Sequence, residues 1–450
     1  MNVSFFRELL DTIVDRGRAL TSLGSSNGSG DQIADLSRQL LSRRGESSGA
    51  LLAQDILAAY RRLDEAGRLD FFKLMAAEFT PDAEAVARAA GEYTANPSPK
   101  TLKALEQALS SPRHEFFRRL NFAPGGTQAI VHMREDLLPL LKAHPDLSPV
   151  DDDLVDLFGS WFNRGFLVLR RIDWSTPATI LEKIIEYEAV HEINGWDDLK
   201  RRLDPHDRRC YAFFHPSLVD EPLIFVEVAL VHEIPSSIEG LITPEAPAIR
   251  GEAPNTAVFY SISNCQKGLA GISFGNFLIK QVVTDLAREI PSLKTFVTLS
   301  PVPGFRSWLD GVRADAANPV LDDETRETLA LLDETGWHTD PERSATLRPL
   351  LLELAAHYFL NEKRSNGQPL DPVARFHLGN GARLERINWP GDLSPRGLAQ
   401  AAGLMVNYLY DIRDIEKNHE AYAEQGKVAA SAAVSKLLKS SRRRHALSPA

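Results

Sequence analysis

The sequence predicts a two-domain α+β protein, with an all-α helical bundle over residues 1–158, an α/β domain over 159–420 and a basic tail over 421–450. Three observations lead to this fold class. The chain has 450 residues, which is well beyond one average domain. Apolar residues recur at helical spacing up to about residue 155, and β-like runs alternate with helices after that point.

The first part of the chain consists of amphipathic helical segments separated by proline and glycine. Residues 48–79 place Leu52, Ile56 and Tyr60 at helical spacing, with charged residues opposite them. Residues 101–111 and 128–144 repeat this pattern. A helical bundle is the simplest arrangement for such segments. It contains no obvious catalytic chemistry, so we expect it to serve oligomerisation or support.

The second part of the chain changes texture near residue 160. Its apolar runs predict strands, while two amphipathic segments and a later alanine- and leucine-rich run predict helices. The predicted strands cover 166–174, 210–216, 221–231, 256–263 and 295–300. The predicted helices cover 176–193, 276–290 and 397–412, and a further helical region extends over 321–360.

Composition and charge exclude several classes of protein. The net charge of −10 opposes general binding to nucleic acid, whose phosphates such a chain would repel. No run approaches the roughly 20 apolar residues of a spanning helix, and charges interrupt the first 20 residues, so we expect neither a membrane segment nor a signal peptide. Two cysteines, Cys210 and Cys265, suit a reducing compartment, and we expect a cytoplasmic protein.

A glycine-bearing loop over residues 268–276 stands between a predicted strand and a predicted helix. Glycine lets a backbone approach a ligand closely, and a helix N-terminus favours an anion such as a pyrophosphate. The loop has neither the Rossmann nor the Walker spelling. A plain strand–turn–helix explains it equally well at this point.

Single residues in the second part are ambiguous when read alone. Ser300 ends a predicted strand before a proline, where a serine usually belongs to a turn. His377 has apolar neighbours, as core histidines do, and spacing alone does not pair it with Ser300. His191 and His232 each precede a glutamate but lack the second histidine of a zinc helix, which favours packing and predicts no metal site.

Four long stretches carry a resemblance to a known family. They read FFHPSLVDEPLIFVEVAL, AVFYSISNCQKGLAGISFGNFLIK, TLSPVPGFRSWL and VARFHLGNGARLERINWPGDLSPRGLAQAAGLMVNYLY, and with their surroundings they cover most of residues 160–412. In these stretches the chain resembles the malonyl-CoA decarboxylase family. Runs of this length are far more specific than any short motif.

The resemblance implies a catalytic domain with the Gcn5-related N-acetyltransferase (GNAT) fold, which converts malonyl-CoA to acetyl-CoA and CO2 without a metal or organic cofactor. It implies Ser300 and His377 as catalytic residues and Tyr410 near them. It places CoA pyrophosphate on a loop that comprises Ala270, Gly271, Ile272, Ser273, Phe274, Gly275 and Asn276. Ser273 departs from the animal members, which carry glutamate there, so no role of that acid transfers. We also expect a homo-oligomer, either a dimer or a tetramer.

The expected chemistry passes through a thioester enolate. His377, with an ordinary pKa near 6.5, would supply the proton, and Ser300 would position the carboxylate or assist the transfer. Two alternatives stay open: an acyl-CoA acyltransferase with the same fold, and a non-enzymatic sensor of malonyl-CoA. Neither the division of labour between the two residues nor tolerance for a methylated substrate follows from the sequence.

Overall fold

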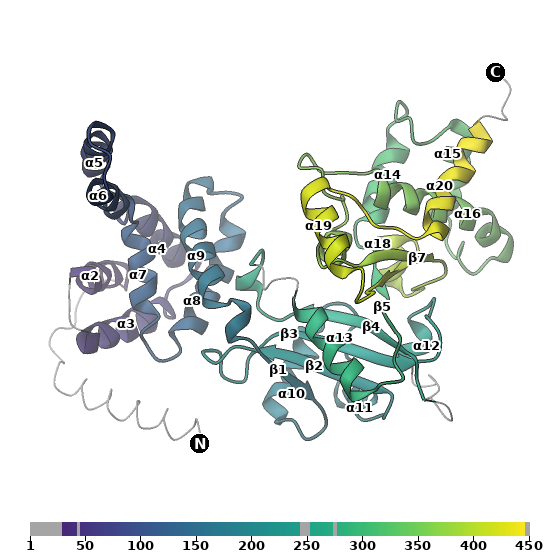
Figure 1. The fold of residues 1–450 in the computed structure, drawn as a ribbon, viewed down its shortest axis with the longest axis horizontal. Helices are drawn as coiled ribbons and strands as arrows, with labels where there is room; N and C mark the ends of the chain where they lie inside the picture. Colours follow the sequence, from purple (N-terminus) through teal and green to yellow (C-terminus); the bar gives the residue numbers. More distant parts are fainter. Residues whose placement is uncertain (1–28, 43–45, 244–252, 273–276, 446–450) are drawn as a thin grey trace. The chain divides into compact units, whose positions relative to one another are not determined.

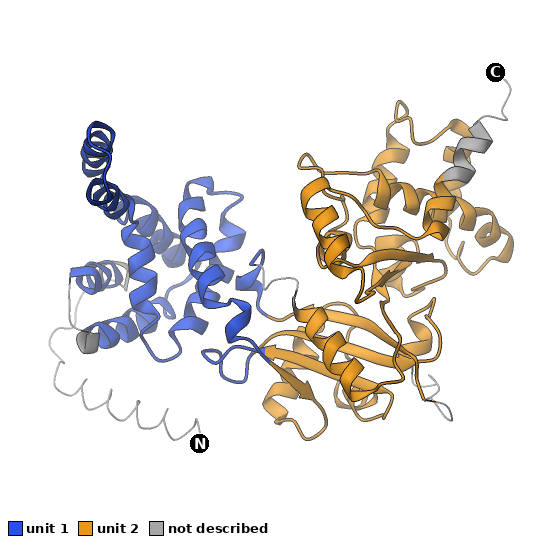
Figure 2. Cartoon of the chain, viewed as in Figure 1, with its two compact units in different colours: residues 1–168, 214–221, 266–274 blue, residues 169–213, 222–265, 275–450 orange. Residues whose placement is uncertain are grey.

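The computed structural model describes residues 29–42, 46–243, 253–272 and 277–445. The chain forms two compact units, which are described separately (Figure 2). Unit 1 comprises residues 1–168, 214–221 and 266–274, and unit 2 comprises residues 169–213, 222–265 and 275–450. Unit 1 therefore includes, by their contacts, two segments that follow strands of the α/β domain in the sequence, residues 214–221 and 266–274.

Unit 1 is the helical bundle that the sequence predicts (Figure 1). Its buried aromatic core is formed by residues such as Phe71, Phe72 and Phe116, whose rings meet edge-on or tilted. Asp64 and Ser98 cap two of the helices with side-chain hydrogen bonds. The helices are α2 (Ser29–Ser42), α3 (Glu46–Tyr60), α4 (Glu65–Glu78), α5 (Ala83–Ala95), α6 (Pro99–Leu109), α7 (Pro112–Leu120), α8 (Gly126–Leu137) and α9 (Ser148–Trp161).

Unit 2 contains nearly all of the described strands and the remaining long helices. The strands are β1 (Val168–Ile172), β2 (Arg208–Phe214), β3 (Pro222–Val231), β4 (Thr256–Asn264), β5 (Thr295–Thr298), β6 (Ser300–Pro301), β7 (Arg383–Asn388) and β8 (Met405–Leu409). The helices are α10 (Ala178–Tyr187), α11 (Trp196–Leu203), α12 (Glu239–Ile242), α13 (Phe277–Glu289), α14 (Phe305–Ala314), α15 (Asp323–Leu329), α16 (Pro341–Leu360), α17 (Pro372–Gly379), α18 (Pro395–Ala401), α19 (Ile415–Gln425) and α20 (Ala432–His445).

These strands form one mixed sheet in the order β1-β2-β3-β4-β5-β8-β6, and β7 pairs with β8. Strands β3 and β4 are antiparallel, with a bulge between Glu227 and Val228. Strands β4 and β5 are parallel, because the chain crosses back through α13 between them. The strand–loop–helix–strand order that the sequence predicts between residues 256 and 300 is thus present.

The predicted helix over residues 397–412 is wrong. Helix α18 ends at Ala401, and the chain then turns through Ala402 and Gly403, which both have positive φ. The left-handed turn stops the helix, and after Leu404 the chain forms β8, whose first four residues are buried. Every residue of a central strand is covered, so β8 lacks the polar alternation that identifies a half-exposed strand.

The C-terminal stretch, which the sequence separates as a basic tail, is also structured. Helix α20 packs against α16 and β7, Val434 is buried, and Ser431 donates a hydrogen bond to the carbonyl of Glu385. No helix among the described residues is long and apolar enough to cross a bilayer.

Candidate active site

The sheet of unit 2 positions Ser300. Ser300 lies in β6, where it pairs with Val406 of β8, and its side chain is buried. The Oγ atom of Ser300 donates, at 2.9 Å, to Oγ1 of Thr298, which is the last residue of β5, the strand that precedes β6 in the sequence. Residues two apart on an extended chain point to the same side, which explains this contact. Ser300 is therefore more than the turn residue that its proline neighbour suggested.

Helix α17 brings His377 to Ser300. Asp371 caps the start of this helix by accepting from the backbone N–H of Ala374, and Pro372 occupies its first turn. His377 lies in the last turn and is only 3% exposed. Its Nε2 atom lies 3.1 Å from Oγ of Ser300, across 77 residues of sequence.

The hydrogen bonds of the site run in one direction. Because Ser300 donates its only hydroxyl hydrogen to Thr298, it must accept from Nε2–H of His377. The neutral ring then has a free lone pair on Nδ1, which lies 2.8 Å from the hydroxyl of Tyr410 and accepts from it. The chain of donors thus runs from Tyr410 through His377 and Ser300 to Thr298. This direction is opposite to that of a serine nucleophile activated by a histidine base.

Burial controls the charge of His377. Desolvation lowers its pKa to about 3, far below the ordinary value near 6.5 that the sequence led us to expect. The imidazole is therefore neutral at pH 7 in the ligand-free protein. Burial also raises the pKa of the Tyr410 hydroxyl, which keeps that group protonated as a donor.

Two residues of the site were missed in the sequence. Tyr408 stacks on the ring of His377, with centroids 4.6 Å apart, and Thr298 accepts from Ser300 and from the backbone N–H of Tyr408. Each stands two positions before a residue that was identified, Tyr410 or Ser300. Side chains two positions apart on a strand point to the same side, which would have indicated both residues. The pattern around Tyr408, however, predicts a helix.

The pairing of strands β4 and β5 ends beside this site. Their parallel pairing ends with Phe259 and Thr298, and Leu299 adds one further hydrogen bond to the carbonyl of Phe259. Strand β4 nevertheless continues to Asn264. Its last residues extend past the end of β5, which stops at Thr298.

The predicted CoA loop is described in part. Ser273, Phe274, Gly275 and Asn276 lie outside the described residues. The backbone N–H groups of Ala270 and Ile272 donate within the loop, to the carbonyls of Lys267 and Leu269. Gly271 lies between them with a φ of +79°, a conformation suited to glycine.

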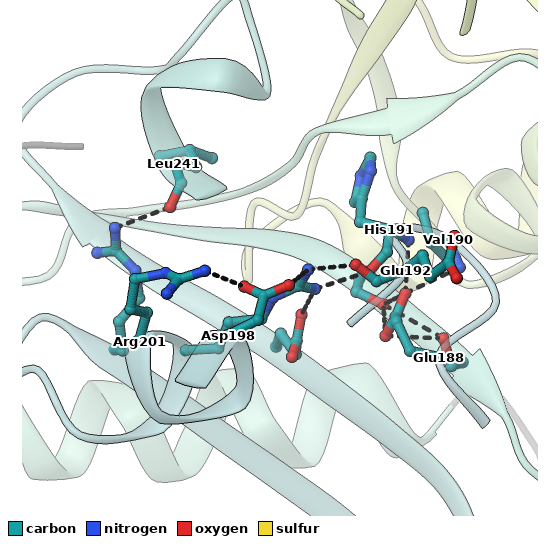
Figure 3. A network of polar contacts seen from close by, with 12 residues as sticks. Glu188, Val190, His191, Glu192, Asp198, Arg201 and Leu241 are labelled. Carbon is teal, nitrogen blue, oxygen red and sulfur yellow. Dashed lines mark hydrogen bonds and ion pairs between the residues drawn. The ribbon is translucent and has the colours of Figure 1, made fainter. Parts of the chain in front are cut away.

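A second buried polar cluster in unit 2 includes Glu188, His191 and Asp198 (Figure 3). Arg202 connects it by donating to the carbonyl of His191, at 2.8 Å, and by pairing with Asp198 and Glu227. It thereby fixes the segment between α10 and α11 to β3. His191 is buried within this network, which lowers its pKa to about 4, and it is not a surface residue.

Acidic, histidine and cysteine side chains do not gather into a metal-binding group of three or more anywhere in the described parts of the chain. The polar groups at Ser300 are hydroxyls, an imidazole and a phenol.

Two family models match the chain. Residues 79–162 match the malonyl-CoA decarboxylase N-terminal domain, and residues 165–448 match the malonyl-CoA decarboxylase C-terminal domain. These matches define a two-domain carboxy-lyase in which the helical unit precedes an α/β unit. The chain belongs to the malonyl-CoA decarboxylase family.

Individual relatives agree. The mitochondrial malonyl-CoA decarboxylase of Anser anser anser is 39% identical over 346 residues, which are 71% of this chain and 68% of that protein. The malonyl-CoA decarboxylase of Rhodopseudomonas palustris has a solved structure with a TM-score of 0.88 and 56% identity, covering 91% of this chain and all of that one. The solved structure of the malonyl-CoA decarboxylase of Agrobacterium vitis has a TM-score of 0.87 and 54% identity, covering 90% of this chain and 99% of that one. The predicted order of a helical bundle followed by an α/β domain is confirmed.

Proposed function

We propose that this protein converts malonyl-CoA to acetyl-CoA and CO2 at the site formed by Ser300, His377 and Tyr410. The observation that carries the proposal is the buried chain of hydrogen bonds through these three side chains, in a chain of this family. The relatives named above bear the name of this activity.

The reaction asks the protein to stabilise an enolate and then to protonate carbon. When the bond to the carboxylate breaks, its electron pair moves into the thioester carbonyl, and the oxygen becomes negatively charged. The thioester accepts the electrons itself, so we propose that no metal or organic cofactor takes part and that CoA is simply a portion of the substrate. Preorganised donors at the developing oxygen lower the barrier.

His377 is the proposed proton donor, and its burial changes how it acts. With a pKa of about 3 the free imidazole is neutral at neutral pH, and its remaining N–H is too weak an acid to protonate carbon. A malonyl carboxylate placed beside it introduces a negative charge into a dry site, which raises the imidazole pKa. Binding of substrate, together with one proton taken up from solvent, would thus charge His377, and loss of CO2 would leave the imidazolium next to the new carbanion. Protonation of carbon returns the ring to its neutral state.

Ser300 is proposed to position the malonyl group. In the ligand-free site its hydroxyl donates to Thr298. Rotation of this hydroxyl toward the substrate would provide a hydrogen bond to the carboxylate or to the enolate oxygen. No covalent acyl-serine is required, because the electron pair released by CO2 has its acceptor in the thioester.

The CoA portion has two proposed contacts. The pantetheine arm carries amides in an extended chain, which suits the part of β4 that continues beyond β5 to Asn264. The pyrophosphate would bind at Gly271 and the residues that follow it, before α13. Because the N–H groups of Ala270 and Ile272 are already bonded, their contribution would be to shape the loop.

We further propose a cytoplasmic location and a homo-oligomer. Both cysteines, Cys210 and Cys265, are free and buried, which suits a reducing compartment. The helical unit is proposed to serve self-association, which the mass of the protein in solution would test.

The activity is tested by incubating purified protein with malonyl-CoA alone and detecting acetyl-CoA by mass spectrometry, with and without a chelator. Acetyl-CoA formed equally in both samples is the expected result. Product that forms only after an amine acceptor is added would indicate an acyltransferase. Tight binding without turnover would indicate a sensor.

The site is tested with S300A and H377N. Both variants should lower kcat at least about a hundredfold, the range that loss of a general acid or an oxyanion donor produces, while binding of CoA is retained. A buried serine outside the site provides the control: Ser37 of α2, which donates to the carbonyl of Ile33, should tolerate alanine without a comparable loss of kcat. Full turnover by both S300A and H377N would contradict the assignment.

A further inference from the structure

The ladder that joins β8 to β5 and β6 is interrupted beside Ser300. On one side of the interruption Val297 pairs with Leu409. On the other side Ser300 pairs with Val406. The two pairs are equally spaced along both strands, so β5 and β6 share one antiparallel register on β8. Between the pairs, the chain is joined to β8 through side chains at Thr298.

Two hydrogen bonds to Thr298 bridge this interruption. The backbone N–H of Tyr408 donates to Oγ1 of Thr298, at 3.2 Å. Nδ2 of Asn407 donates to the carbonyl of Thr298, at 2.8 Å. In a regular antiparallel ladder that carbonyl would accept from a backbone N–H of the neighbouring strand. The amide of Asn407 therefore takes the place of a backbone donor.

The side chain of Asn407 is held in one orientation. It is fully buried, and its Nδ2 atom also donates to the carbonyl of Pro235, at 3.3 Å. Its Oδ1 atom accepts from Nε of Arg386, at 3.1 Å, and from Nδ2 of Asn388, at 2.8 Å. With the bond to Thr298, these contacts use both hydrogens and both lone pairs of the amide. Because Nε of Arg386 can only donate, a reversed amide would face that donor with its own NH2 group.

Asn407 lies on the other side of the sheet from the reacting groups. Side chains alternate along a strand, so Asn407 points away from the face on which Tyr408 stacks on His377. Thr298 connects the two faces, since its carbonyl accepts from Asn407 and its hydroxyl oxygen accepts from Ser300. Asn407 thus reaches Ser300 through Thr298.

We infer that Asn407 is a positioning residue of the decarboxylation site, which fixes Ser300 by holding the peptide of Thr298. The inference rests on the proposed function, in which Ser300 positions the malonyl group. Without Asn407 the buried carbonyl of Thr298 loses this donor at the point where the ladder is interrupted. The backbone between Val297 and Ser300 is then free to shift, and a displacement of about 1 Å in a catalytic group can cost up to about a hundredfold in rate.

Asn388 of β7 provides a matched control. It is 4% exposed, and alanine at either position removes a buried amide of the same size from one of two paired strands. Of these two asparagines, Asn407 is the one that bonds Thr298. In N388A the Oδ1 atom of Asn407 still accepts from Arg386, so the bond to Thr298 is retained.

The experiment is a double-mutant cycle that combines N407A with S300A. In the wild-type background N407A should lower kcat for malonyl-CoA about tenfold and leave KM within about twofold. In the S300A background the same change should alter kcat by less than about twofold, because the group that Asn407 positions is already absent. N388A should leave kcat within about twofold in both backgrounds, although its loss of thermal stability is similar to that of N407A.

The cycle separates positioning from a general loss of structure. Equal losses of kcat in the two backgrounds, or equal losses in N388A and N407A, would overturn the inference. N407D keeps the size and the acceptor oxygen of the side chain but lacks the donor to Thr298, and it should repeat the pattern if N407A does not fold.

A spectroscopic arm distinguishes this inference from the proposed function. Wild-type protein that does not decarboxylate malonyl-CoA would overturn the proposed function. The nuclear magnetic resonance signal of the His377 Cε1–Hε1 pair, identified by its absence in H377N, still reports on the contact between Ser300 and the imidazole. It should shift in N407A and stay in place in N388A. An unchanged signal in N407A would show that Asn407 does not position Ser300.

Discussion

The neutral state of His377 leads to a measurable titration. The imidazole is enclosed between Ser300, Tyr410 and the ring of Tyr408, and desolvation lowers its pKa to about 3. In an unfolded chain a histidine titrates near 6.5. We therefore predict that His377 remains neutral from pH 8 down to pH 5, an interval over which an exposed histidine becomes charged.

The free energy of unfolding should depend on pH because the folded and unfolded states of His377 bind protons differently. Between pH 6.5 and 3 the unfolded state binds a proton that the folded state does not, so stability falls as the pH falls and is fully present above 6.5. At pH 5 the unfolded imidazole is about thirty-fold more protonated than neutral, which corresponds to about 2 kcal/mol lost relative to pH 8. The full difference, reached only near pH 3, would be about 5 kcal/mol.

Nuclear magnetic resonance of the histidine Cε1–Hε1 pairs measures the titration directly. The chain has 12 histidines, and the signal that disappears in H377N identifies the one of interest. Amide hydrogen exchange in β8, compared between wild type and H377N at each pH, measures the loss of stability. H377N should become less pH-dependent than the wild type between pH 8 and 5. A midpoint near 6.5 for His377 in the folded protein would refute the reasoning from burial.

Ligands extend this test to the mechanism. A sulfonate analogue of malonyl-CoA brings an acidic group to the site, and it should raise the pKa of His377 by more than acetyl-CoA, which lacks that group. If the analogue binds and the imidazole still titrates near 3, His377 is not charged by the substrate. The proposed proton transfer would then be wrong, even with decarboxylation intact.

Three further predictions concern the supports of the site. Y410F should lower kcat about tenfold or more with KM unchanged, because Nδ1 of His377 loses its hydrogen-bond donor. Y408F keeps the stacked ring, and its kcat and KM should be close to those of the wild type. D371A should cost about 1–2 kcal/mol in thermal unfolding and lower kcat by shifting α17, whereas D371N retains a capping oxygen and should preserve both. R202M should destabilise unit 2 by about 3–5 kcal/mol in hydrogen exchange, because it leaves the buried carboxylate of Asp198 without its cation. A loss below about 1 kcal/mol would show that the cluster is weakly coupled.

Local patterns predicted much of the fold. The helical spacing of Leu52, Ile56 and Tyr60 corresponds to α3, and the apolar run from Thr256 corresponds to β4. These elements are long and their periodicity is clear, so local sequence suffices to identify them. The glycine loop between β4 and α13 was also placed correctly in the chain, since glycine marks a turn by its own conformational freedom.

Contacts between distant residues were not predictable in the same way. Ser300 and His377 are 77 positions apart, and the resemblance alone joined them before the structure did. The charge of His377 depends on what encloses it, and no pattern around residue 377 records that. The hydrogen bond from Arg134 of α8 to the carbonyl of Gly268 joins residues 134 positions apart. An arginine within a helical segment gives no sign of such a partner.

The error at β8 had the largest consequence, because this strand connects every part of the site. It pairs with β5, β6 and β7, and it carries Tyr408, with Tyr410 one residue beyond its end. Side chains alternate along a strand, so a shift of one residue in its pairing would turn both tyrosines away from His377. The pairs of Ser300 with Val406 and of Pro301 with Met405 set this register on one side, and β7 sets it on the other. The stacking of Tyr408 on His377 and the hydrogen bond from Tyr410 to Nδ1 therefore both depend on the register of β8. The two tyrosines placed by this register help to bury the imidazole, and this burial lowers its pKa.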